Sequence, residues 1–120
     1  MKLIIAGGRD FNDYRLLEKS VNEYRYKNTD NLDTDIQIIS GGANGADRLG
    51  ERYAEENNLA LKIFSADWNK WGKSAGPRRN TEMAEYADTL MAFYDGKSKG
   101  TSNMILTAKI KNLKVHIIKY

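Results

Sequence analysis

The sequence predicts an α/β fold: a three-layer, open parallel sheet of about five strands with helices on both faces. Short apolar runs alternate along the chain with amphipathic stretches of helical length, which is the pattern of strands joined by covering helices. Glycine-rich segments follow three of the apolar runs, where they let the backbone adopt positive φ and let a ligand approach. The length of 120 residues suits a single domain, to which we assign residues 1–120.

Each element is assigned from its local pattern. Asn12 and Thr101 are the expected caps of the first and last helix, and Pro77 suits a first helical turn. Residues 28–35 are interpreted as a polar connector and residues 65–76 as a long loop. The predicted strands are 2–6, 36–40, 59–64, 89–94 and 114–118, and the predicted helices are 13–26, 45–57, 77–87 and 101–112.

Right-handed crossovers between these strands give the Rossmann-like order 3-2-1-4-5, with the first strand in the centre. In such a sheet, ligands bind beyond the carboxyl ends of the strands, near the point where the strand order reverses. The three glycine-rich segments, residues 7–11, 40–47 and 95–101, all begin at a predicted strand end. We therefore expect them to meet at one edge of the sheet and to form a ligand site there.

The composition excludes several kinds of site. The chain has no cysteine, so neither a disulfide framework nor a thiolate metal centre can form. It has a single histidine, His116, which we interpret as structural, and we expect no metal site. The apolar run at residues 1–6 is too short for a signal peptide or a membrane span, which favours a cytoplasmic protein. A net charge of +3 favours anionic partners, although acidic residues are spread among the basic ones.

The glycine-rich strand ends supply most of the candidate ligand-binding residues. A helix that follows such a loop offers free N–H groups and a partial positive charge to a phosphate. Arg79 and Asn80 lie in the first turn of the third predicted helix, where a cation opposes the helix dipole unless an anion offsets it. The candidates are Gly7, Gly8, Arg9, Asp10, Ser40, Gly41, Gly42, Ala43, Asp47, Arg79, Asn80, Asp95, Gly100 and Thr101.

Three polar or aromatic residues have two interpretations each. Asp47 either reciprocates a helix cap at Asn44 or accepts a hydrogen bond from a ribose hydroxyl or a base N–H. Arg9 either pairs with Asp10 or Asp47, or contacts a phosphate, whose geometry its planar group matches. Trp68 could stack on a base, but a lone Trp in a loop is more often a packing residue over the sheet edge, and we favour that role.

The order and spacing of these motifs resemble the YspA-like (cpYpsA-related) family of the SLOG superfamily, named for the Smf/DprA DNA-processing proteins and the cytokinin-activating LOG proteins. The resemblance covers nearly the whole chain and implies a Rossmann-like fold that binds or senses a nucleotide-derived ligand, with no further cofactor evident. That ligand would be a nucleoside phosphate, a cyclic nucleotide or an ADP-ribose-type signal. The resemblance also implies a bacterial or phage-encoded protein and a homodimer. It rests on residues 7–11, 40–43, 45–47, 67–68, 76–77, 79–80 and 100–101.

One position departs from the LOG enzymes, which are phosphoribohydrolases. Their motif Pro-Gly-Gly-x-Gly-Thr-x-x-Glu ends in a glutamate that takes part in cleaving the base from a nucleoside monophosphate. Here Gly100 and Thr101 are present, but Met104 stands at the glutamate position, and Asp95-Gly96 replaces the Pro-Gly pair. A thioether can neither move a proton nor stabilise a cationic centre, so the sequence favours ligand binding over LOG-type cleavage.

Two alternative functions stay open. The first is a nucleotide-processing hydrolase of N-glycosidase type, with Asp47, Glu82 and Asp95 as the candidate catalytic carboxylates, although the sequence contains no standard hydrolase or Walker A motif. The second is single-stranded nucleic-acid binding as in DprA, because basic and aromatic residues together suit backbone and base contacts. The residues that motivate the second alternative are Lys70, Trp71, Lys73, Lys97 and Lys99.

Overall fold

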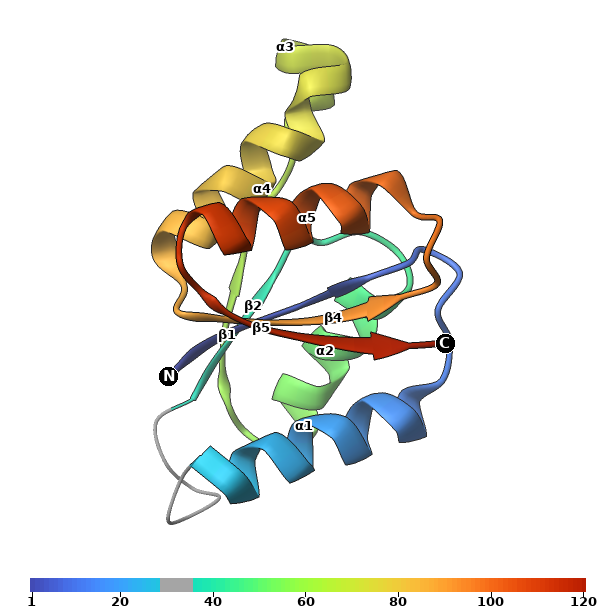
Figure 1. Cartoon of the computed structure of the whole chain (residues 1–120), viewed down its shortest axis with the longest axis vertical. Coiled ribbons are helices and arrows are strands. Elements are labelled where there is room, and N and C mark those ends of the chain that lie inside the picture. Colours follow the sequence, from blue (N-terminus) through green and yellow to red (C-terminus); the bar gives the residue numbers. More distant parts are fainter. Residues whose placement is uncertain (29–35) are drawn as a thin grey trace.

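The computed structural model describes residues 1–28 and 36–120, and it contains the parallel sheet that the sequence predicts. The strand order is β3-β2-β1-β4-β5, and every pairing is parallel (Figure 1). The strands are β1 (Lys2–Gly7), β2 (Gln37–Ser40), β3 (Ala60–Ile63), β4 (Thr89–Tyr94) and β5 (Lys114–Lys119). The helices are α1 (Tyr14–Asn28), α2 (Ala46–Glu56), α3 (Trp68–Trp71), α4 (Ala75–Tyr86) and α5 (Lys99–Ile110), with a 3₁₀ turn η1 (Gly72–Ser74).

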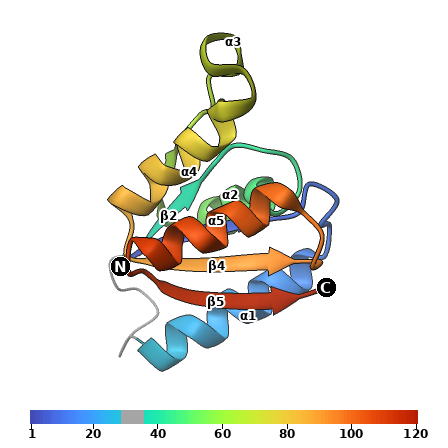
Figure 2. The ribbon, with the colours of Figure 1, turned by 45° about the horizontal axis from the view of Figure 1, so that its top comes forward.

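Hydrophobic cores lie on both faces of the sheet, because successive side chains of a strand point to opposite faces. In β1, Leu3 and Ile5 pack with residues of α1 and α2, whereas Ile4 and Ala6 pack with residues of α4 and α5. Figures 1 and 2 show the resulting three layers. Burial on both faces explains why β1 and β4 are almost continuously apolar in sequence.

The carboxyl ends of β1, β2 and β4 meet at one edge of the sheet. Gly7 pairs with Phe93 of β4, and Ile4 pairs with Ile39 of β2, so the three strands end at nearly the same level. The segments that follow them are therefore neighbours in space, although the second and third follow the first by more than 30 and more than 80 residues. This edge is where the sequence predicts the ligand site.

The long loop predicted at residues 65–76 is wrong in part, since it contains α3 and η1 and since α4 begins at Ala75. The side chain of Asp67 accepts a hydrogen bond from the backbone N–H of Lys70 and so caps α3. A helix of four residues is too short to produce a periodic apolar pattern, which is why the sequence did not reveal it. The segment projects from the body of the molecule (Figure 1).

Several predicted caps are also wrong. Asp13, not Asn12, accepts from the backbone N–H of Leu16 at the start of α1. Ser98, not Thr101, caps α5, which begins two residues earlier than predicted. Of the predicted connector at 28–35, Asn28 closes α1 and residues 29–35 lie outside the described part of the chain. None of the described helices is both long and apolar enough to cross a membrane.

Candidate functional site

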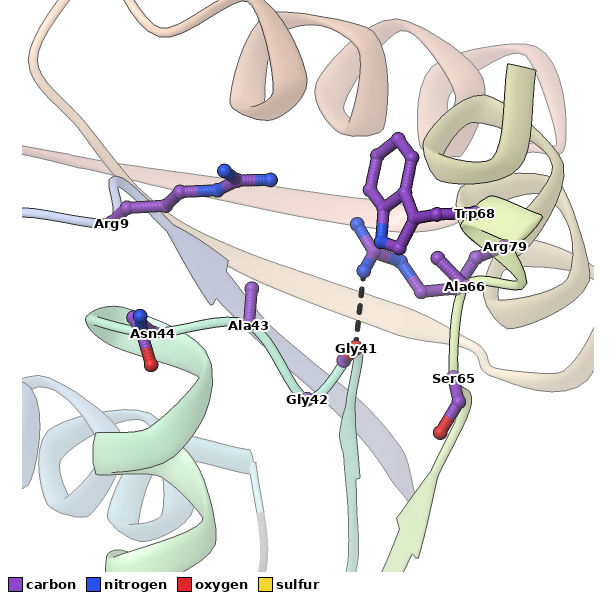
Figure 3. A pocket seen from close by; sticks show the side chains of 9 residues that line it. All are labelled: Arg9, Gly41, Gly42, Ala43, Asn44, Ser65, Ala66, Trp68 and Arg79. Atoms are coloured by element: carbon purple, nitrogen blue, oxygen red, sulfur yellow. Dashed lines mark hydrogen bonds between the residues drawn. The ribbon is translucent and has the colours of Figure 1, made fainter. Parts of the chain in front are cut away.

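Two adjoining hollows open at the carboxyl edge of the sheet, and Arg9, Ala43 and Arg79 line both of them. The first hollow, of about 290 Å³, lies between the loop after β2 and the start of α3 (Figure 3). The second, of about 370 Å³, lies between the segments that follow β1 and β4. Thirteen of the fourteen candidate ligand-binding residues line one hollow or both; Ser40 is the exception.

Ser40 is fully buried beneath the loop that follows β2. Its Oγ accepts from the N–H of Gly42 at 3.0 Å and donates to Oε2 of Glu51 at 2.6 Å. Ser40 therefore supports the loop from below and does not face the hollow. The sequence did not single out Glu51, although its place four residues after Asp47 on α2 puts the two on the same helix face.

Asp47 holds the same loop from the side of α2. Only 5% of this residue is exposed, and its Oδ2 accepts from the N–H of Ala43 at 3.2 Å. Burial raises the pKa of the carboxyl to about 6, against the lowering effects of the Ala43 bond and the Arg79 charge. The predicted cap at Asn44 is wrong, because Gly45 occupies the N-cap position and makes no side-chain bond there.

Gly41 is required by the close approach of Asp47 and Arg79. A Cβ at this position would lie 2.8 Å from Oδ2 of Asp47 and 3.0 Å from Nε of Arg79. Arg79 crosses from α4 to the loop and donates from Nη1 to the carbonyl of Gly41 at 3.1 Å. Glycine thus lets one carboxylate and one guanidinium meet over the end of β2.

The two arginines place positive charge between the hollows, and the nearby carboxylate of Asp47 offsets only part of it. Within residues 1–28 and 36–120, neither Arg9 nor Arg79 forms an ion pair, and Nε of Arg79 is buried without a hydrogen-bond partner. Burial, the largest effect, and the charge of Arg9 lower the pKa of Arg79, while the charge of Asp47 raises it without cancelling them. Figure 3 shows the Arg9 side chain extending toward Trp68 and Arg79. Such a pair of guanidinium groups suits a phosphate or another oxyanion.

The loop after β4 uses its backbone donors internally. Oδ1 of Asp95 accepts from the N–H groups of Lys97 and Ser98 at 2.8 and 2.9 Å, and these bonds lower the pKa of the carboxyl. Oγ of Ser98 accepts from the N–H of Thr101 at 3.3 Å. The sequence suggested that free N–H groups here receive a phosphate, but these three already have partners within the chain.

The floor and side wall of the second hollow are structural. Met104, at the position of the LOG glutamate, is 1% exposed and belongs to the core beneath α4 and α5. Asn80 is buried, and its Nδ2 donates to Oδ1 of Asn103 at 2.9 Å and to the carbonyl of Gly100 at 3.4 Å. Asn80 therefore joins α4 to the first turn of α5 as well as lining the hollow.

Tyr120 is part of this edge, although no motif in the sequence pointed to it. Its hydroxyl donates to Oδ1 of Asp10 at 2.7 Å, and its ring packs against Phe11. A Cβ at Gly8 would overlap the Tyr120 hydroxyl, so the tyrosine covers the segment after β1. β5 ends beside β4 at the same sheet edge, which brings residue 120 to residue 10.

Trp68 both packs and lines a hollow. One edge of its indole ring packs over Gly76, where an added Cβ would lie 3.2 Å from the ring. The residue is nevertheless 49% exposed and borders the first hollow beside Arg79 (Figure 3). The structure therefore agrees with the packing interpretation in part and leaves a ring surface accessible.

Other predicted residues lie elsewhere. Glu82 is exposed on α4 and borders a separate depression with Trp71 and Arg78, so the structure does not bring it to the strand ends. His116 lies on the edge strand β5, and its ring packs against Tyr24 with centroids 4.6 Å apart, as expected of a structural residue. In the described ranges, no cluster of three or more His, Asp or Glu side chains could hold a metal ion.

Comparisons with known proteins agree with this architecture. The model of the YspA, cpYpsA-related SLOG family (YAcAr) matches residues 1–71, more than half of the chain. The Gene 61 protein of Mycobacterium phage D29 is 38% identical in an alignment of 80 residues that covers 62% of this chain and 64% of the phage protein. DNA processing protein A (DprA) from Streptococcus pneumoniae has the same fold, with a TM-score of 0.76 and 17% identity. That match covers 97% of this chain and 49% of DprA, so the chain spans only part of either relative.

Proposed function

Because the chain belongs to the YspA, cpYpsA-related SLOG family, we propose that it binds a nucleotide-derived ligand at the carboxyl edge of its sheet. The phosphate of this ligand lies between Arg9 and Arg79. The ligands that the family resemblance suggests are nucleoside phosphates, cyclic nucleotides and ADP-ribose-type compounds, all of which carry a phosphate. The edge of a parallel sheet beside its central strand is also where ligands bind in such folds.

The observation that carries this proposal is the state of Arg79. Its guanidinium is largely buried, has one backbone acceptor, keeps Nε without a partner, and faces a second arginine. Burying a cation with an unsatisfied donor costs free energy unless another group compensates for it. A bound phosphate supplies an acceptor oxygen for Nε and adds negative charge to the part that Asp47 already provides.

The proposed activity is binding or sensing, without cleavage. Each carboxylate near the hollows already accepts a hydrogen bond within the chain: Asp47 from Ala43, Asp95 from its own loop, and Asp10 from Tyr120. Met104 supplies no acid at the position where LOG enzymes have one. These groups hold the loops in place, which supports a site that retains a nucleotide.

A comparison of two adjacent arginines tests the proposal. Arg79→Ala removes the guanidinium that lines both hollows, whereas Arg78→Ala removes an exposed one that stacks on Trp71 with the guanidinium 3.7 Å from the ring centre. Calorimetry and thermal shift against a panel of nucleotides should show binding to the wild type and to Arg78→Ala. Arg79→Ala should bind roughly ten- to a hundredfold more weakly, because a charge-assisted bond is lost.

Two results would contradict the proposal: no nucleotide stabilises the wild type, or Arg79→Ala binds as well as Arg78→Ala. Chromatography after long incubation separates binding from hydrolysis. Nucleotides should be recovered unchanged, and release of free base would instead support the hydrolase alternative with Asp47 or Asp95.

A second candidate function is single-stranded nucleic-acid binding, favoured by the shared fold with DprA, a DNA processing protein. The projecting segment α3–η1 exposes Trp68 and Trp71, at 49% and 40%, beside Lys70 and Lys73. Exposed aromatic rings with lysines suit base stacking and backbone contact. A mobility shift with a labelled single strand should appear at low salt and weaken as salt increases; its absence at low salt would dismiss this candidate.

A further inference from the structure

The two hollows differ in charge. The nine residues that line the first hollow include both arginines and Trp68 but no carboxylate. The second hollow shares both arginines but is also lined by three acidic residues, Asp10, Asp47 and Asp95, and by Ser98 and Thr101. Two parts of one ligand with different chemistry are therefore expected to occupy them.

Next to these carboxylates a phosphate is disfavoured, because like charges at short distance in a partly buried site repel, so the phosphate belongs beside the arginines that the two hollows share. The carboxylates favour a group that donates several hydrogen bonds. Asp10 and Asp95 each engage Oδ1 in the bonds described above, and a carboxylate has acceptor capacity for more. The hydroxyls of a sugar fit such a wall.

The first hollow has the features of a base site. Its ring surface comes from Trp68, which is half exposed and is held at one edge against Gly76. The capping bond that Asp67 accepts from the N–H of Lys70 fixes the short helix that carries Trp68. A positioned aromatic ring beside two cations suits an aromatic base attached to a phosphate.

We propose, on the basis of the function proposed above, that the ligand is a nucleoside diphosphate that carries a second sugar. Its base stacks on Trp68 in the first hollow, its phosphates lie between Arg9 and Arg79, and its second sugar enters the carboxylate-lined hollow. The arginines line both hollows, so one ligand can extend through them. A nucleoside monophosphate fills only the first hollow and binds more weakly.

Three probes and two tryptophan variants test the inference by calorimetry: ADP-ribose, AMP and ribose 5-phosphate, with Trp68→Ala and Trp71→Ala. Trp71 is a matched control, because it lies on the same short helix, is similarly exposed, and lines neither hollow. ADP-ribose should bind at least tenfold more tightly than AMP. Trp68→Ala should weaken ADP-ribose and AMP roughly five- to a hundredfold and leave ribose 5-phosphate unchanged, whereas Trp71→Ala should change none of the three.

A fluorescence measurement keeps Trp68 in place and so does not depend on the folding of Trp68→Ala. The chain has two tryptophans, so Trp71→Phe leaves Trp68 as the sole tryptophan reporter. ADP-ribose should quench its fluorescence, and ribose 5-phosphate at a saturating concentration should not. Equal quenching by both probes would overturn the stacking role.

The outcomes separate the two proposals. If nucleotides bind and require Arg79, but Trp68→Ala binds ADP-ribose as the wild type does, or AMP binds as tightly as ADP-ribose, the inference is overturned and the proposed function stands. If neither these probes nor any member of the nucleotide panel binds, both are overturned.

Discussion

At the scale of a single residue, Asp47 holds the loop after β2 in place although burial destabilises its charged form. Its carboxylate holds Ala43 in place and lies close to Gly41, yet it is almost fully buried. Burial penalises the charged form, and the nearby Arg79 only partly compensates, so the pKa is raised to about 6. The charged carboxylate therefore holds the loop at a cost in folding free energy.

A pH dependence of stability follows from this raised pKa. Between the ordinary value of 3.8 and about 6, the folded protein binds the Asp47 proton more tightly than the unfolded chain, so stability from this group falls as the pH rises through that window. The full difference is on the order of 3 kcal/mol. Urea unfolding at pH 4 to 7 should show the wild type losing stability relative to Asp47→Asn. Glu55→Gln, which neutralises an exposed carboxylate of the same helix, should show no such trend, and a pH-independent difference for Asp47→Asn would contradict the expectation.

At the scale of the elements, short polar side chains set where the helices begin. Asp13, Asp67 and Ser98 each accept from a backbone N–H three residues later, at the starts of α1, α3 and α5. Apolar periodicity predicted α1 and α5 but not α3, and it could not choose among neighbouring polar residues as the caps of α1 and α5. That choice also decides which backbone donors stay available to a ligand.

Removal of the α5 cap should lower stability. Ser98→Ala leaves the N–H of Thr101 without its acceptor and should reduce the free energy of unfolding by about 1 kcal/mol. Ser102→Ala, at an exposed position of the same helix, should be neutral or slightly stabilising because alanine favours helix. The two variants are compared by urea denaturation, and equal stabilities would mean that Ser98 is not the effective cap.

At the scale of the whole molecule, the segments after β1 and β2 fit together through backbone contacts. The carbonyl of Gly8 accepts from the N–H groups of both Phe11 and Ala46, each at 3.2 Å. Gly45 has φ of 82°, and a Cβ there would lie 2.2 Å from the Gly8 carbonyl oxygen. The start of α2 can therefore approach β1 only because residue 45 has no side chain.

Two glycines with nearly the same φ distinguish strain from collision. Gly96 has φ of 85°, but a Cβ there would meet nothing within 4 Å, so Gly96→Ala should cost about 1 kcal/mol from backbone strain alone. Gly45→Ala should cost roughly 1–3 kcal/mol more, because the added methyl group collides with backbone and because φ 82° with ψ −128° is a conformation that only glycine readily adopts. Chemical denaturation measures the free energy of unfolding of both variants. Similar losses of stability would contradict the expectation and would mean that the two segments move apart at little cost.

The sequence by itself determined the sheet, its order and the group of segments at its carboxyl edge. These depend on local apolar patterns and on the handedness of crossovers, so Gly7, Gly41 and Asp95 could be placed at strand ends without coordinates. Membership in the family, which the comparisons show, follows from the same ordered motifs.

Only the tertiary structure decided which of these residues face the hollows and which hold the loops. Ser40 was predicted as a ligand contact, yet it lies beneath its loop and bonds with Glu51 and Gly42. Asp95 lines the second hollow, but its Oδ1 also holds the N–H groups of Lys97 and Ser98. Tyr120 reaches Asp10 across 110 residues, and no local pattern encodes that contact. The physical reason is that each polar group can form only a few hydrogen bonds. Partners that are distant in the chain but close in space determine which of those bonds stay within the protein and which remain available to a ligand.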